Sequence, residues 1–142
     1  MVSCVVGTRA HRRVLTGMTG ERFVGNRAQL RRGILNLSYP IQFGKVLNWD
    51  NMESIWNHIL YEELKVAPEE VPVLHSDSPL NPNADREKMA QIMFESFNVP
   101  AMYVVKHPVL SLYSSGRTIG LIVDVGEGNS LTLPIYEGYG IM

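Results

Sequence analysis

The residues best suited to chemistry lie in one short segment, Ile122 to Ser130, which reads Ile-Val-Asp-Val-Gly-Glu-Gly-Asn-Ser. Asp124 ends an apolar run, Gly126 and Gly128 follow one residue apart, and Ser130 supplies a hydroxyl. Glycines let successive backbone N–H groups point into one concavity that can hold phosphate oxygens. A carboxylate beside it can hold the hydration shell of Mg²⁺. An ordinary hairpin with glycine in its turn has the same pattern, so the segment alone leaves both interpretations open.

The histidines and the single cysteine show no metal-site pattern. Cys4 is the only thiol, so no intramolecular disulfide can form, which favours a reducing compartment. His11, His58 and His75 have no metal-ligand spacing to one another or to Cys4. His107 differs only in standing at the expected start of a helix. We expect surface or hydrogen-bonded positions for these residues rather than a metal cluster.

Hydrophobic periodicity predicts the elements that position this segment. An apolar stripe of helical spacing predicts a helix of about 16 residues over 50–65, capped by Asn48 or Asp50. The elements expected after it are a strand at 71–75, a helix at 82–97 started by Asn81-Pro82, a strand at 101–105, a helix at 108–115, a buried strand at 118–123 and a strand at 130–136. Glycines without periodicity over 7–33 predict loops and short strands. Alternating strands and helices indicate an α/β fold.

Composition and charge exclude several classes of function. The chain has 142 residues, 45% of them hydrophobic and 19% charged, as in one globular domain. No apolar run reaches the roughly 18 residues of a membrane span. Residues 1–32 hold seven arginines and one acid, whereas the remaining residues hold six basic and thirteen acidic side chains. This basic segment has one aromatic residue, Phe23, and no base-reading motif, so we expect no nucleic-acid partner.

Several runs of sequence resemble actin, in order and with nearly constant spacing. These runs are RGIL at 32–35, YPI at 39–41, NWD at 48–50, VAPEE at 66–70, PLNPNADREKMAQIMFESF at 79–97, NVPAMYV at 98–104, SLYSSGRT at 111–118 and PIYEGY at 134–139. The chain therefore resembles the actin family over almost its whole length.

The resemblance implies part of the two-lobed, actin-like ATPase fold, which is ribonuclease H-like, α/β, and built on a mixed sheet with flanking helices. Residues 1–40 resemble the small subdomain, with a DNase-binding-loop-like segment at Arg9–Gly25. Residues 41–115 resemble part of the large subdomain with its hinge helix, and residues 116–142 the first hairpin of the opposite lobe, with the second phosphate loop. The first phosphate loop and the adenosine pocket are expected to lie outside the 142 residues.

The resemblance also implies site residues. Asp124 matches the aspartate that holds metal-bound waters, which implies an indirect Mg²⁺ ligand. Gly126, Glu127, Gly128 and Ser130 match the second phosphate loop, which implies Mg-ATP or Mg-ADP as the cofactor.

Three departures from the family pattern weaken that expectation. His107 stands where the family has the glutamine that positions the attacking water, and Leu131 stands where it has a histidine beside that water. Phe43 replaces a histidine that faces the phosphate-release route. A neutral imidazole at position 107 can still hold a water, but Leu131 cannot. We expect catalytic roles for Asp124 and His107 to be impaired, and nucleotide binding to be weak or absent.

Three functions are consistent with the sequence. The first is a divergent actin-like cytoskeletal protein, cytoplasmic, with a structural or interaction role and with actin or actin-binding proteins as partners. The second is an ATP-hydrolysing filament protein whose missing segments lie outside this chain. The third is a truncated gene product without function. The sequence leaves open whether the chain is an enzyme.

Overall fold

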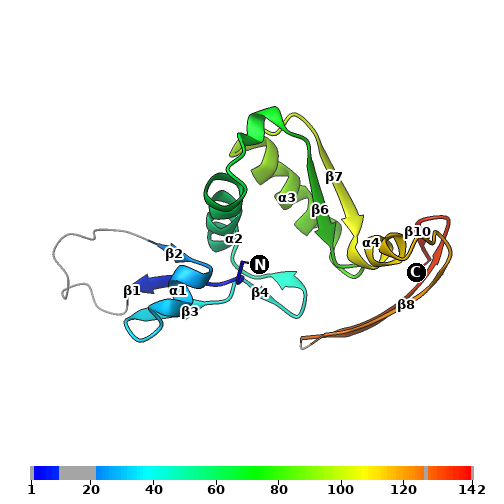
Figure 1. Ribbon diagram of the computed structural model, residues 1–142, viewed down its shortest axis with the longest axis horizontal. Coiled ribbons are helices and arrows are strands. Elements are labelled where there is room, and N and C mark those ends of the chain that lie inside the picture. The colour runs from blue at the N-terminus through cyan, green and yellow to red at the C-terminus, as the bar shows by residue number, and fades with distance from the viewer. Residues whose placement is uncertain (1, 10–21, 127, 142) are drawn as a thin grey trace. The chain divides into compact units, whose positions relative to one another are not determined.

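The computed structural model describes residues 2–9, 22–126 and 128–141 (Figure 1). The chain forms two compact units: the first contains residues 1–42 and 46–67, and the second contains residues 43–45 and 68–142. Each unit combines helices with small sheets, which confirms the predicted α/β class. Most of the expected DNase-binding-loop-like segment, residues 10–21, lies outside the described part of the chain.

The first unit is built on a three-stranded antiparallel sheet in the order β2-β1-β3. Its strands are β1 (Val6–Arg9), β2 (Phe23–Val24) and β3 (Leu35–Ser38), and the short helix α1 (Asn26–Leu30) contacts β1 and β2 (Figure 1). Within the described residues, the expectation of short strands rather than a long helix over 7–33 is confirmed.

Alternating side chains of this sheet belong to two small cores. Val5 and Phe23 pack with Ala28 of α1, whereas Val6 and Val24 pack with Ile55. A methyl group added at Gly7 would lie 2.7 Å from the end of the Leu35 side chain, so a larger residue there would require that side chain to shift. Cys4 packs at the edge of the second core, where burial raises the pKa of its thiol and a hydrogen bond with the backbone of Ile41 opposes that rise. One face of the sheet is therefore covered by α1, and the other face is covered by Ile55.

The predicted helix over 50–65 is present, but it changes type along its length. The α-helix α2 (Trp49–Asn57) continues into a π-helix, η1 (His58–Glu63). The side chain of Asn48 accepts a hydrogen bond of 2.9 Å from the Asn51 N–H, so Asn48 is the cap. The predicted apolar stripe is confirmed: Met52, Ile55, Trp56 and Leu60 are buried and Ile59 is partly buried.

Short elements connect the two units in sequence. Strands β4 (Ile41–Gln42) and β5 (Lys45–Val46) pair as a hairpin, and the 3₁₀ turn η2 (Pro68–Glu70) follows η1. The hairpin tip, residues 43–45, belongs to the second unit.

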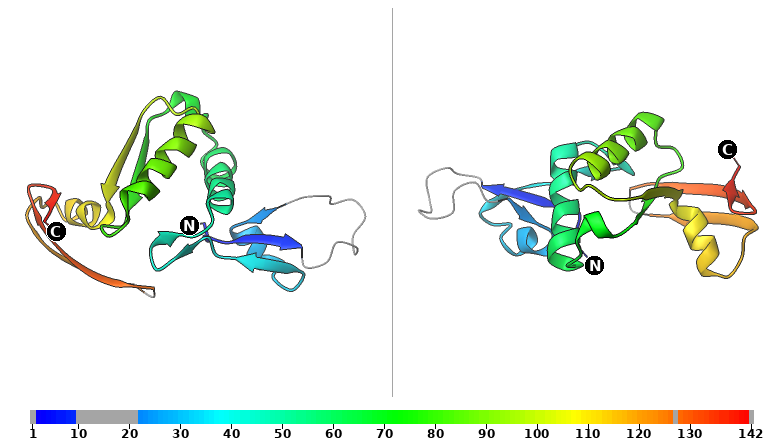
Figure 2. Two further views of the ribbon diagram at one scale, coloured as in Figure 1. Left: turned by 180° about the vertical axis from the view of Figure 1, so that it is seen from behind. Right: turned by 90° about the horizontal axis from the view of Figure 1, so that it is seen from above.

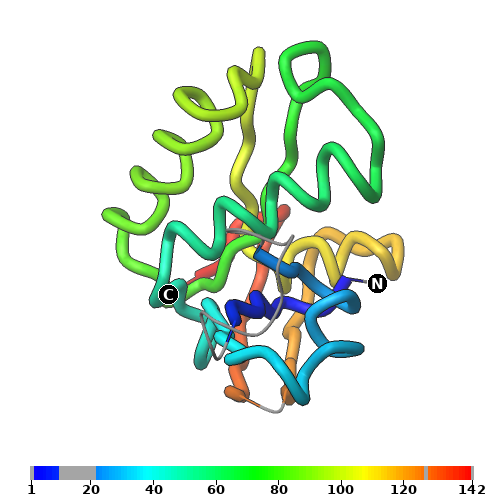
Figure 3. The backbone as a smooth tube through the Cα atoms, turned by 90° about the vertical axis from the view of Figure 1, so that its left-hand side faces the viewer, coloured from blue at the N-terminus to red at the C-terminus, as the bar shows by residue number. Residues whose placement is uncertain are grey.

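The second unit begins with a parallel βαβ motif. Strand β6 (Val73–Asp77) pairs in parallel with β7 (Met102–Lys106), and helix α3 (Asn83–Glu95) connects them and runs alongside β7 (Figure 3). The apolar side chains of the predicted helix over 82–97 are buried at Met89, Ile92 and Met93 of α3 and at Phe97, two residues after its end.

The expected cap of this helix is wrong. Pro82 is the N-cap residue, and the Asn81 amide instead donates a 2.7 Å hydrogen bond to the Asp77 carboxylate. The buried Asp77 carboxylate needs hydrogen-bond partners, so the Asn81 side chain donates to it and does not cap the helix.

The second unit ends with a helix on a hairpin. Helix α4 (His107–Ser114) stops at Ser115 and Gly116, whose φ of 74° favours glycine. Strands β8 (Gly120–Val125), β9 (Ser130–Tyr136) and β10 (Tyr139–Gly140) form an antiparallel sheet, and α4 contacts β8 (Figure 2). The predicted hairpin is confirmed.

The prediction that the strand over 118–123 is buried is wrong. Helix α4 packs through Val109 and Leu112 onto the face that carries Leu133 and Ile135. The alternate residues of β8 point to the other face, and Val123 is 64% exposed. An antiparallel sheet needs only one packed face, so an apolar run did not establish burial on both faces.

Candidate functional site

A polar network lies where the parallel strands β6 and β7 end. Asp77 is the last residue of β6 and lies opposite Lys106 at the end of β7, and His107 follows directly as the first residue of α4. The carboxyl ends of parallel strands are where ligand sites usually form in α/β sheets. The topology of the second unit therefore brings three titratable residues to this edge.

Asp77 is the buried centre of the network. Only 5% of the residue is exposed, and its carboxylate accepts hydrogen bonds from the Asn81 amide and from Nε of Arg86 in α3. Nη1 of Arg86 also donates to the side chain of Asn83, whereas its Nη2 is buried without a hydrogen-bond partner among the described residues. A buried carboxylate with a cation and an amide donor is compensated, so this pair fixes the end of β6.

His107 connects Asp77 to Asp124 of the hairpin. Its Nδ1 lies 3.1 Å from the main-chain carbonyl oxygen of Asp77, and its Nε2 lies 3.0 Å from Oδ2 of Asp124. A carbonyl oxygen and an ionised carboxylate can only accept hydrogen bonds, so the ring makes both hydrogen bonds at once only when both of its nitrogens carry a proton. In this arrangement the ring has no free nitrogen lone pair to accept a hydrogen bond from water.

Asp124 has an apolar neighbour across the hairpin. Its Cα partner in the register of β8 and β9 is Leu131, so both side chains lie on the sheet face that α4 covers. Leu131 packs at the edge of the core formed by Val109, Leu112, Leu133 and Ile135. The carboxylate of Asp124 is 48% exposed and is stabilised by His107 rather than by its cross-strand partner.

The glycine turn between β8 and β9 closes on itself. The N–H of Gly126 donates a 2.9 Å hydrogen bond to the carbonyl of Asn129. A methyl group added at Gly126 would lie 3.3 Å from that same oxygen, so the turn is tight. In this conformation the Gly126 N–H is used inside the hairpin and does not point into a phosphate-binding concavity.

The structure brings together two of the sequence-predicted site residues, Asp124 and His107. Gly128 and Ser130 lie exposed along the turn and the first position of β9, and Glu127 lies outside the described residues. Sequence reasoning missed Asp77, Asn81 and Arg86. The signal that could have indicated Asp77 is an acidic residue at the end of a strand. The expected strand ended at His75, two residues before Asp77.

The comparison with protein families settles membership. The family model described as Actin matches residues 1–142. The chain belongs to the actin family. The partial actin-like fold expected from the resemblance is therefore confirmed at the level of the family and of the mixed α/β architecture.

Actin-family proteins in general bind a nucleotide with a divalent metal. In this chain, Asp124 and Gly126 are among the residues expected by resemblance to lie against that group. Oδ2 of Asp124, the residue expected to hold metal-bound waters, lies 3.0 Å from Nε2 of His107, so a metal-bound water would compete with the ring for this oxygen. Gly126 has no free N–H for a phosphate oxygen. In the arrangement described, these residues do not fit a metal–triphosphate group.

Neither a metal-ligand cluster nor a membrane-spanning helix is found in the described residues of this actin-family chain. Over residues 2–9, 22–126 and 128–141, no group of three or more His, Cys, Asp or Glu side chains is placed to hold a metal ion. None of the helices in the same ranges has the length and apolar character needed to cross a membrane.

Proposed function

We propose that this chain is a divergent actin-like protein of the cytoskeleton that acts through contacts with actin or actin-binding proteins rather than by hydrolysing ATP. The observation that carries this proposal is the contact between His107 and Asp124, with Nε2 and Oδ2 at 3.0 Å. By resemblance, His107 stands at the position that orients the attacking water, and Asp124 stands at the position that holds metal-bound water. The contact joins these two residues. Nε2 of His107 and Oδ2 of Asp124 then contact each other instead of water or metal, while both side chains remain partly exposed.

The electrostatics of the pair support this function. Hydrolysis of a nucleoside triphosphate requires cations against the phosphates and a group that orients the attacking water. Here the main-chain oxygen of Asp77 and Oδ2 of Asp124 lie within hydrogen-bond distance of the two ring nitrogens of His107. The ring therefore cannot orient a water as a hydrogen-bond acceptor while these contacts last.

Leu131 supports the same proposal. By resemblance it takes the place of a histidine beside the attacking water, and it lies directly across the hairpin from Asp124. An alkyl side chain makes no hydrogen bond and instead packs toward Leu133 and Leu112. The second water-orienting position has thus become part of a small hydrophobic core.

An interaction role is favoured by the outer face of the hairpin sheet. Leu121, Val123 and Val125 are 61%, 64% and 75% exposed on β8, the outer strand of the order β10-β9-β8. Contiguous exposed apolar side chains are typical of surfaces that bind other proteins. This exposed strand supports a role in binding other proteins. As part of the same proposal, we assign residues 1–40, 41–115 and 116–142 to the parts of actin that they resemble.

The experiment is co-sedimentation of the full chain with preformed actin filaments, with and without nucleotide. We expect binding that does not depend on ATP. Val123→Lys should weaken it, whereas Gln42→Lys, which places the same charge at an exposed residue outside β8, should not. Absence of binding to filaments and to monomeric actin, with the chain itself folded, would contradict the proposed role.

A further inference from the structure

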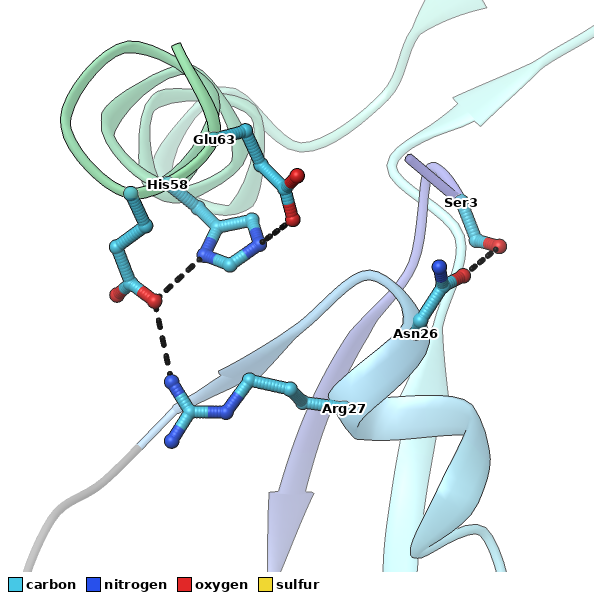
Figure 4. Close-up of polar contacts among 6 residues, drawn as sticks. Ser3, Asn26, Arg27, His58 and Glu63 are labelled. Carbon is cyan, nitrogen blue, oxygen red and sulfur yellow. Dashed lines mark hydrogen bonds and ion pairs between the residues drawn. The ribbon is translucent and has the colours of Figure 1, made fainter. Parts of the chain in front are cut away.

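His58 is a buried histidine held between two carboxylates in the first unit. The residue is 7% exposed, and it begins the π-helix η1. Its Nδ1 lies 3.2 Å from Oε2 of Glu62, and its Nε2 lies 3.3 Å from Oε1 of Glu63 (Figure 4). Each ring nitrogen therefore faces a carboxylate oxygen, and the ring can donate to both oxygens only when both nitrogens carry a proton.

The π-helical conformation makes this double contact possible. In an α-helix the residue at i+4 lies near residue i, but the residue at i+5 points to another side. In a π-helix the hydrogen bonds run from i to i+5, and Leu64 N–H donates at 2.8 Å to the carbonyl of Ile59, five residues earlier. His58 is therefore flanked by its i+4 and i+5 neighbours, Glu62 and Glu63.

Glu62 extends the contact to another element. Its Oε2 also lies 3.1 Å from Nη1 of Arg27, which belongs to α1 beside the sheet (Figure 4). One carboxylate oxygen thus joins η1 to α1. Arg27, Glu62 and His58 line a cleft of about 560 Å³ in the first unit, together with Arg22, Asp50 and Glu53. The Arg27 and Glu62 side chains are 56% and 54% exposed, so a ligand can reach this link.

We propose that Arg27, Glu62, His58 and Glu63 form a conformational lock that ties α1 to η1 and holds residues 58–63 in the π-helical form. The lock is closed when the imidazolium bridges both glutamates and Arg27 holds Glu62. When it opens, η1 loses the charge contacts that favour i to i+5 hydrogen bonds, and α1 loses its charged link to the helix. The lock lies in the first unit, apart from the residues that carry the proposed function.

The test is residue-resolved amide hydrogen exchange of the full chain. Glu63→Gln removes the contact that only the π-helix allows, and we expect exchange of the Leu64 N–H to accelerate about three- to tenfold. Glu69→Gln, an exposed glutamate outside the lock, is the matched control and should leave this amide unchanged. The Met52 N–H in α2 should also be unaffected. Equal acceleration at Met52 and Leu64, or none at either, would overturn the proposal.

A second set of variants leaves the buried His58 ring unchanged and tests the contact between Arg27 and Glu62. Arg27→Gln and Glu62→Gln should each accelerate exchange of the Leu64 N–H. The double variant should be no faster than Glu62→Gln alone, because both remove the same contact. Arg32→Gln, at an exposed arginine just beyond α1, is the control. A double variant whose acceleration is the product of the two single effects would overturn the link through Glu62.

Discussion

His107 Nε2 lies 3.0 Å from Oδ2 of Asp124, and this contact joins the first residue of α4 to the fifth residue of β8. The side chains are 32% and 48% exposed, so the pair is accessible to solvent and to ions. Exposed pairs of this kind contribute only about 0–1 kcal/mol to stability. Its consequence is chemical: one oxygen of the carboxylate expected to hold metal-bound water already has a side-chain partner.

Replacing His107 should therefore expose a cation site. In His107→Gln the carboxylate of Asp124 loses its imidazole partner, and we expect Mn²⁺ affinity to rise about tenfold or more over the unchanged chain. Titration calorimetry with Mn²⁺ measures this. The double variant His107→Gln with Asp124→Asn should lose the gain. Equal Mn²⁺ affinity in the unchanged chain and in His107→Gln would contradict the role given to the pair.

Nucleotide affinity should be low. The Gly126 N–H is used inside the hairpin and Asp124 is paired, so we expect a Kd for Mg-ATP of ~0.1–1 mM or weaker. Calorimetry with Mg-ATP checks this. Where binding is detected, Asp124→Ala and Gly126→Val should abolish it, since valine at position 126 meets the Asn129 carbonyl. Binding that survives both changes would place the site elsewhere.

Stability should fall at mildly acidic pH because of His75 in β6. Burial lowers the pKa of this imidazole below its ordinary value of about 6.5. The unfolded chain therefore takes up the proton first, so the contribution is fully present above about pH 6.5 and is lost as pH falls toward the folded pKa. Thermal unfolding at pH 7.5 and 5 should show a larger loss for the unchanged chain than for His75→Gln. Equal losses would contradict this.

Much of the second unit could be predicted from periodicity. The order strand, helix, strand, helix, hairpin follows from apolar stripes and from glycine and proline positions, and the Asn48 cap follows from local chemistry. These features depend on residues close in sequence. The family resemblance, rather than the glycine turn, indicated His107 and Leu131 as site positions.

The rest depends on contacts between distant residues. The role of Asp77 requires Arg86 and His107, nine and thirty residues away, and the strand pattern ends before it. The π-helical turn at 58–63 has no period that distinguishes it from an α-helix in a short window. The uncovered face of β8 could not be predicted either, because an apolar run does not reveal what packs on each side.

That uncovered face should make the chain self-associate. β8 has Leu121, Val123 and Val125 exposed and lies at one edge of its sheet, where unpaired N–H and C=O groups recruit other strands. Light scattering after size-exclusion chromatography should show oligomers at micromolar concentration. Val123→Lys should shift the distribution toward monomer, because strand pairing would bury a charge, and Gln42→Lys should not. A monomer under all these conditions would count against this prediction.

The most direct test of the central claim is steady-state phosphate release from ATP by the full chain, with and without Mg²⁺. We predict no release above background, because His107 and Asp124 occupy each other and Leu131 makes no hydrogen bond. Asp124→Ala is the control for any contaminating activity, since it removes the paired carboxylate. Mg²⁺-dependent turnover comparable to that of intact actin, abolished in Asp124→Ala, would contradict the account.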